Sequence, residues 1–141
     1  MNLLAIDRAD LGKGVWALGI RGSLDASNVN SFAEAAAALI GQGARDVLIE
    51  LREAQYVSSA GFGGFLKVVD DAAERRGRVV FVGVPPSIKG VFKLLGLETA
   101  LAFAPDRQTA LTYLNAGITI ADGSAASPAE GERGSTALPS E

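Results

Sequence analysis

The segment Val57-Ser58-Ser59-Ala60-Gly61-Phe62-Gly63-Gly64 contains the residues most suited to chemistry. It places two hydroxyl groups and three glycines between a predicted strand and a predicted helix. The first amides of a helix have no partner within the helix, and the helix dipole makes this end positive. The segment therefore predicts a position that favours an anion.

Three interpretations of this segment compete. In the first, Ser58 or Ser59 is the N-cap of the helix, and the glycines allow close packing on the sheet. In the second, the glycines bind a nucleotide, but Leu66 stands where a dinucleotide motif has its third glycine, and no Gly-Lys-Ser/Thr sequence follows. In the third, a serine of the segment is a phosphoacceptor.

A phosphoryl group on such a serine would affect binding more than folding. It adds about −1.5 to −2 charges at a helix N-terminus, where the dipole stabilises it by only about 0.3–1 kcal/mol. A partner that buries the unmodified hydroxyl against apolar surface meets a larger desolvation cost, and about 1.4 kcal/mol corresponds to tenfold weaker binding. The modification would thus act on an interface and leave the domain folded.

The composition excludes many other kinds of site. The chain of 141 residues has no cysteine and no histidine, which excludes disulfides, thiolate nucleophiles, Cys/His zinc sites and imidazole-based triads. Its 48% apolar and 21% charged residues are typical of a globular protein with one core. The start, Met1-Asn2-Leu3-Leu4-Ala5-Ile6-Asp7, does not resemble a signal peptide, so we expect a cytoplasmic protein without membrane insertion.

The formal net charge of −3 belongs to the C-terminal segment. Residues 118–141 are rich in Gly, Ser, Ala, Pro and Glu and carry four acidic residues against one basic residue, so we expect a disordered acidic tail. Residues 1–117 then hold 12 basic and 12 acidic residues. A balanced domain gives no electrostatic reason to expect a nucleic-acid partner.

Hydrophobic periodicity predicts strands that alternate with helices after an opening hairpin. We expect the hairpin from Leu3–Ala9 and Gly14–Gly22, with the sheet covered mainly on one side, and buried strands at Asp46–Leu51 and Val79–Val84. A short edge strand is expected at Leu101–Phe103.

Four helices are expected between these strands. The first is capped by Ser27 or Asn28, the third by Ser87, and the last by Asp106. The predicted buried faces are Phe32, Ala35, Ala36, Leu39 and Ile40 in the first helix; Phe62, Phe65, Leu66, Val69, Ala72 and Ala73 in the second; and Ile88, Val91, Phe92 and Leu95 in the third, which ends near Gly96.

Four segments occur in the order and spacing of STAS domains, and on them the chain resembles a stand-alone bacterial anti-sigma factor antagonist. The segments are Gly22-Ser23-Leu24-Asp25, Val57 to Gly63, Gly77-Arg78-Val79-Val80-Phe81-Val82-Gly83, and Ser87 to Leu97. The resemblance implies a STAS domain over residues 1–117, an α/β fold in which an N-terminal β-hairpin leads into a mixed β-sheet with about four helices packed mainly on one face.

The resemblance also implies a site and partners. The family motif reads Asp-Ser-Ser/Ala-Gly-Leu-Gly, and its first serine is phosphorylated by a partner kinase. Mapped onto this chain, Ser59 is the phosphoacceptor, Ser58 stands at the aspartate position and Ser23 replaces a family glutamate, whereas Asp25 matches. The implied partner surface comprises Ser23, Asp25, Ser58, Ala60, Gly61 and Phe62.

The resemblance implies partner switching without an enzymatic activity, cofactor or metal in the chain itself. The unmodified protein binds an anti-sigma factor or serine kinase with a histidine-kinase-like ATPase fold, phosphorylation of Ser59 breaks the complex, and a PP2C-type phosphatase restores it. Two alternatives remain open. One is a constitutive STAS subunit of a lipid-transport or stress-signalling assembly, and the other is a small nucleotide-binding enzyme.

Three further groups of residues are interpreted as structural. Asp70 and Asp71 point about 100° apart on a helix, which favours a solvated face over a metal site. The basic cluster Arg75, Arg76 and Arg78 suits a helix C-terminus. The apolar segment of Phe92, Leu94, Leu95 and Leu97 is expected to be mostly core, with an exposed member near Lys89 and Lys93 at the edge of the partner surface.

Overall fold

The computed structural model describes residues 3–116. These residues divide into two compact units, one that ends at Val79 and one that begins at Val80. The predicted tail over residues 118–141 lies outside the described residues.

The first unit opens with the expected hairpin. Strand β1 (Leu4–Asp10) pairs antiparallel with β2 (Val15–Leu24). The turn between them has Gly12, Lys13 and Gly14 in the left-handed region, with φ of 87°, 57° and 81°. Val15 and Ala17 are buried on one face of β2, and Leu18 and Ile20 on the other. The expectation of one-sided cover is wrong for this strand, because the face with the smaller residues Val15 and Ala17 is buried as well as the face with Leu18 and Ile20.

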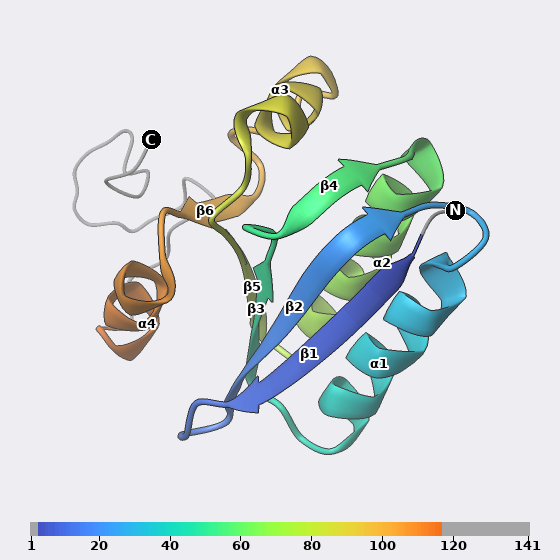
Figure 1. Cartoon of the computed structure of the whole chain (residues 1–141). Coiled ribbons are helices and arrows are strands. Elements are labelled where there is room, and N and C mark those ends of the chain that lie inside the picture. Colours follow the sequence, from blue (N-terminus) through green and yellow to red (C-terminus); the bar gives the residue numbers. More distant parts are fainter. Residues whose placement is uncertain (1–2, 117–141) are drawn as a thin grey trace. The chain divides into compact units, whose positions relative to one another are not determined.

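Two short strands run parallel to β2, one after the other. Strand β3 (Asp46–Glu50) pairs with the first half of β2, and β4 (Ala54–Val57) pairs with its last three residues, with a register shift between Gly22 and Ser23. The sheet is therefore mixed, with an antiparallel hairpin and parallel pairs (Figure 1). The sequence pattern predicts β3 but not β4, because β4 has only four residues and its apolar residues do not alternate.

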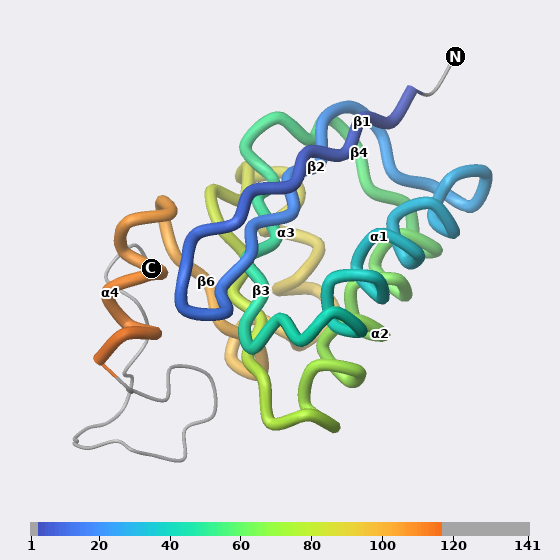
Figure 2. Tube along the Cα trace, turned by 90° about the horizontal axis from the view of Figure 1, so that it is seen from below, coloured from blue at the N-terminus to red at the C-terminus, as the bar shows by residue number. Residues whose placement is uncertain are grey.

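Helices α1 (Val29–Gly41) and α2 (Ser59–Glu74) lie side by side on one face of these strands (Figures 1 and 2). The rings of Phe32 and Phe65 meet edge to face with centroids 5.5 Å apart. The helices approach closely at Gly64, where a Cβ atom would lie 2.7 Å from Val29 Cγ2. This packing orders both helices against the sheet.

The buried face predicted from the sequence is confirmed for α1 and is confirmed only in part for α2. All five residues predicted for α1 are buried. In α2 the expectation is wrong at Ala73, which is exposed, and at Leu66 and Val69, which are only half-buried. It also misses Val68, which is buried. Residues 62, 65, 68 and 72 form the buried stripe, so the periodicity holds and only the stripe's direction around the helix differs.

The second unit contains the parallel pair β5 (Arg78–Val82), whose first two residues belong to the first unit, and β6 (Ala102–Ala104). It also contains α3 (Pro86–Leu94) and α4 (Arg107–Asn115). Its aromatic core is formed by Phe81, Phe92 and Phe103, whose ring centroids lie 5.1–5.8 Å apart. These elements agree with the strands and helices expected from the sequence.

The N-termini of α4, α3 and α1 test three capping predictions. The carboxylate of Asp106 accepts a hydrogen bond from the Thr109 amide at 2.7 Å, which confirms the cap of α4. The cap predicted at Ser87 is wrong, because α3 already begins at Pro86 and its N-cap position is Pro85. Asn28 occupies the N-cap position of α1, but its side chain makes no capping hydrogen bond.

The buried face predicted for α3 is wrong at Leu95. Ile88 and Phe92 are buried and Val91 is half-buried, whereas Leu95 is 54% exposed and Leu94 is 86% exposed. The helix ends at Leu94, and Gly96 with φ of 74° turns the chain away from the helix axis. The segment after Phe92 is thus less buried than the sequence suggests.

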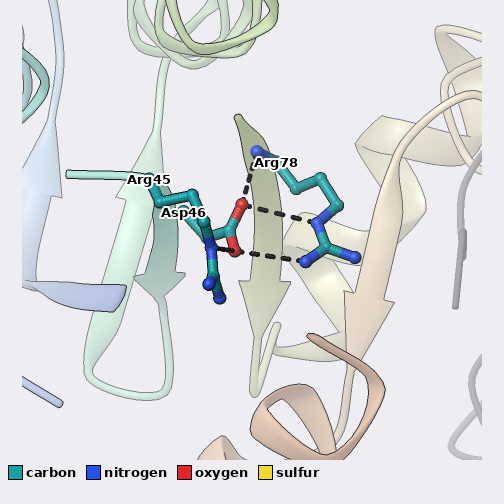
Figure 3. A network of polar contacts seen from close by, with 3 residues as sticks. All are labelled: Arg45, Asp46 and Arg78. Atoms are coloured by element: carbon teal, nitrogen blue, oxygen red, sulfur yellow. Dashed lines mark hydrogen bonds and ion pairs between the residues drawn. The ribbon is translucent and has the colours of Figure 1, made fainter. Parts of the chain in front are cut away.

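Among the residues that the structure describes, Asp46 is the only charged residue that is buried, with 1% of its surface exposed (Figure 3). Its carboxylate accepts hydrogen bonds from Arg45 Nε at 2.8 Å and from the Arg78 amide at 2.8 Å, with further contacts from the Arg78 guanidinium at 3.3 and 3.4 Å. This network ties the start of β3 to the start of β5.

Other charged residues also make local polar contacts within the fold. Arg75 Nη1 donates to the carbonyl of Ile40 in the last turn of α1 at 3.0 Å. Asp71 contacts Lys67 at 3.4 Å on the surface of α2. On the hairpin, Arg21 Nε donates a hydrogen bond to the Asp7 carboxylate at 2.9 Å, and this contact raises the pKa of the Arg21 guanidinium.

We expect Asp46→Asn to lower the free energy of unfolding by about 2–4 kcal/mol, because an amide removes the charge and turns donors toward the two arginines. Asp71→Asn, which breaks only a surface pair, should change it by less than about 0.5 kcal/mol. Urea denaturation measures both values. Equal effects of the two substitutions would contradict the role given to the network.

Candidate functional site

Two loops meet at one edge of the sheet because β2 and β4 are neighbouring parallel strands. Leu24 and Val57 are paired near the carboxyl ends of these strands. The backbone amide of Ser58 donates to the carbonyl of Leu24 at 2.9 Å. The loop that begins at Asp25 and the start of α2 therefore lie side by side, although they are far apart in the sequence.

The Asp25 loop is held by its own polar side chains. One carboxylate oxygen of Asp25 accepts from the Ser27 amide at 2.9 Å and from the Ser27 hydroxyl at 2.6 Å. The Asn28 side chain accepts from the Asp25 amide and donates to the carbonyl of Ser23, each at 2.9 Å. Asp25 thus orders the loop, as expected for an acid that positions a backbone rather than one that catalyses.

The two serines at the start of α2 have different environments. Ser58 is the N-cap, and its Oγ accepts from the Gly61 amide at 3.3 Å. Ser59 is the first helical residue and is exposed. Within residues 3–116 the structure records no hydrogen bond of the Ser59 hydroxyl. The N-cap interpretation is confirmed for Ser58, which leaves the hydroxyl of Ser59 available for chemistry.

Gly61 and Phe62 lie on the buried side of the start of α2 and allow it to pack closely on the sheet. A Cβ atom at Gly61 would lie 2.7 Å from Val57 Cγ1 and 3.1 Å from the Leu24 carbonyl oxygen, so only glycine fits there. Phe62 is 4% exposed, and its ring meets Phe65 edge to face. Both residues are buried supports of the site, whereas Ser23 and Ala60 are half-buried.

Two exposed residues beside the predicted site are not part of the partner surface predicted from the sequence. Tyr56, which is opposite Ser23 in the β4–β2 pair, is 55% exposed. Gly63 is exposed one helical turn after Ser59. The sequence contains the aromatic residue two positions before the cap and the i+4 spacing from Ser59, but neither feature shows that these residues are exposed.

Packing accounts for two of the three glycines that the nucleotide interpretation invoked. Gly61 and Gly64 are both explained by close packing, against β4 and α1 respectively. Within residues 3–116 no group of His, Cys, Asp and Glu side chains could hold a metal ion. None of the helices in this part of the chain combines the length and the hydrophobicity that spanning a membrane requires.

Comparison with known proteins identifies the family. The model of the STAS domain matches residues 10–110, most of the described chain. The chain belongs to the STAS domain family. The expected fold, with its N-terminal hairpin, mixed sheet and, within residues 3–116, four helices, is that of this family.

Named relatives of this STAS domain include BtrV of Bordetella bronchiseptica, whose name assigns it provisionally as an anti-sigma factor antagonist. The two proteins are 26% identical over 107 residues, which cover 76% of this chain and 90% of BtrV. The anti-sigma factor antagonist SpoIIAA in its unphosphorylated form superimposes with a TM-score of 0.68 at 20% identity, covering 82% of this chain and 99% of SpoIIAA. Phosphorylated Bacillus SpoIIAA gives 0.65 at 19% identity, with 78% and 99% covered.

The two serines should respond differently to substitution. Ser58→Ala removes the cap and should lower the free energy of unfolding by about 0.5–2 kcal/mol, whereas Ser59→Ala should change it by less than about 0.5 kcal/mol. Ser58→Asp supplies another good cap and should retain most of the stability. Thermal and urea unfolding test this order, and a larger loss for Ser59→Ala than for Ser58→Ala would refute it.

Proposed function

We propose that this STAS domain is an anti-sigma factor antagonist of a partner-switching pathway, and that Ser59 is its phosphorylation switch. The observation that carries the proposal is the division of tasks at the start of α2. Ser58 uses its hydroxyl to cap the helix, and Ser59 presents its hydroxyl to solvent at the motif position that bears the phosphoacceptor in the family. The name of BtrV supports the same function.

The position of Ser59 suits a phosphoryl group. It is the first residue of a 16-residue helix, where free amides and the helix dipole favour an anion by about 0.3–1 kcal/mol. The serine is exposed, so a kinase reaches it without unfolding the helix. That SpoIIAA has been described in unphosphorylated and phosphorylated forms supports the idea that a fold of this kind tolerates the modification.

The partner surface in this proposal consists of exposed residues on a buried support. Ser59 and the Asp25 loop contact the partner, with Ser23, Ser58 and Ala60 at its edge. Gly61 and Phe62 belong to the site as positioning residues, since both are buried beneath the start of α2. Asp25 acts through the loop that its carboxylate orders.

Phosphorylation would then weaken binding through desolvation. The Ser59 hydroxyl is small and loses little when a partner covers it, whereas a phosphate of about −1.5 to −2 charges is strongly hydrated. Residues 1–117 are formally neutral, so no surplus of positive charge in this region offsets the added charge. A kinase with a histidine-kinase-like ATPase fold would supply the phosphoryl group, and a PP2C-type phosphatase would remove it.

Incubation of the full chain with ATP and each candidate kinase encoded near its gene, followed by mass spectrometry, tests the proposal. We expect one phosphoryl group at Ser59, no incorporation into Ser59→Ala, and normal incorporation at Ser59 in Ser58→Asp, which keeps the helix capped. Ser31→Ala, which removes an exposed hydroxyl of α1 outside the predicted site, is the matched control and should be modified at Ser59 as well.

Two outcomes count against the switch. The first is modification only of serines in residues 118–141, such as Ser124 or Ser135. The second is a kinase that binds the chain tightly but modifies no residue, which would instead favour a constitutive STAS subunit.

A further inference from the structure

Helix α2 has three glycines close together, at positions 61, 63 and 64, and they differ in what surrounds them. A Cβ atom at Gly61 would lie 2.7 Å from Val57 Cγ1, and one at Gly64 would lie 2.7 Å from Val29 Cγ2. At Gly63 a Cβ atom would meet nothing within 4 Å. Packing therefore explains two of the glycines and leaves Gly63 without a reason inside the described structure.

Backbone conformation does not require glycine at position 63 either. Gly63 is not among the residues with positive φ, and it lies inside the α-helix, where alanine fits well. Glycine is one of the least favourable residues in a helix interior, because it loses more backbone freedom on folding than alanine. Alanine at this position would make the isolated domain more stable. Glycine therefore lowers the free energy of unfolding, and no packing contact within the described structure compensates for it.

Open space alone does not single out Gly63, since Gly41 in α1 and Gly90 in α3 also have nothing within 4 Å of a Cβ atom. What distinguishes Gly63 from these two glycines is its position. It lies four residues after Ser59, so both residues share one face of α2, and both are exposed. Gly63 thus exposes helix backbone without a side chain next to the proposed phosphorylation site.

We propose that Gly63 is a specificity residue of the partner interface, where the backbone of the anti-sigma kinase packs directly on the backbone of α2. This inference rests on the proposed function and adds to it the way in which the partner reaches Ser59. A methyl group projects about 1.5 Å from Cα. Backbone atoms in contact with a glycine Cα would therefore come too close to a Cβ atom, and the kinase could no longer seat itself over the Ser59 hydroxyl.

The test compares Gly63→Ala with the unaltered chain in two measurements. Thermal unfolding of the free protein should give a midpoint raised by about 1–4 °C, because the helix gains an alanine and no contact is crowded. Calorimetric titration with the kinase that modifies Ser59 should give a dissociation constant at least tenfold higher. Gain of stability together with loss of binding is a combination that damage to the fold does not produce.

Gly41→Ala is the matched control. Gly41 has the same open surroundings but is the last residue of α1, about 18 Å along the helix from its start after the Asp25 loop. This variant should bind the kinase as the unaltered chain does. Gly63→Gln, with a longer side chain, should bind more weakly than Gly63→Ala.

The outcomes separate this inference from the proposed function. If the unaltered chain binds and is phosphorylated at Ser59, but Gly63→Ala binds within threefold of it, the inference is wrong and the proposed function stands. A fall in the midpoint of Gly63→Ala also overturns the inference, because it would show an internal need for glycine. If no kinase binds the unaltered chain, the proposed function and the inference both fail.

Discussion

The site depends on the parallel pairing of β2 with β4. That pairing sets Leu24 beside Val57, and the hydrogen bond from the Ser58 amide to the Leu24 carbonyl joins the two chain segments where their strands end. The Asp25 loop and the first turn of α2 become neighbours only through it. The need for glycine at position 61 follows from the same constraint, because a side chain there would collide with Val57 and Leu24.

The same arrangement separates stability from recognition. Residues that hold the start of α2 are buried or engaged in hydrogen bonds, as are Gly61, Phe62 and the capping hydroxyl of Ser58. Ser59 and Gly63 lie on the outer side of the helix, where neither contributes to packing. Under the proposed function, a change at the outer side, whether a phosphoryl group or a methyl group, would alter what binds and leave the fold intact. This separation suits a protein that signals by exchanging partners.

Most of the fold was predictable from the sequence, because long periodic segments such as α1 determine their own buried face. The misses have physical reasons. Strand β4 is too short to show a period, and Leu95 belongs to a turn rather than to the helix before it. At the site, the chemistry of Ser58 and Ser59 was recognisable, but the assignment of the cap to Ser58 needed the coordinates. The exposure of Tyr56 and Gly63 depends on neighbours that only the folded chain provides.

The most direct test of the switch is the affinity of one chemically defined pair. The chain phosphorylated stoichiometrically at Ser59 and the unmodified chain are titrated against the same kinase by calorimetry, with the unfolding midpoint of each form measured in parallel. The account predicts binding at least tenfold weaker for the phosphorylated form and midpoints within about 3 °C of each other. Equal affinities, or a phosphorylated form that binds weakly only because it has unfolded, would contradict it.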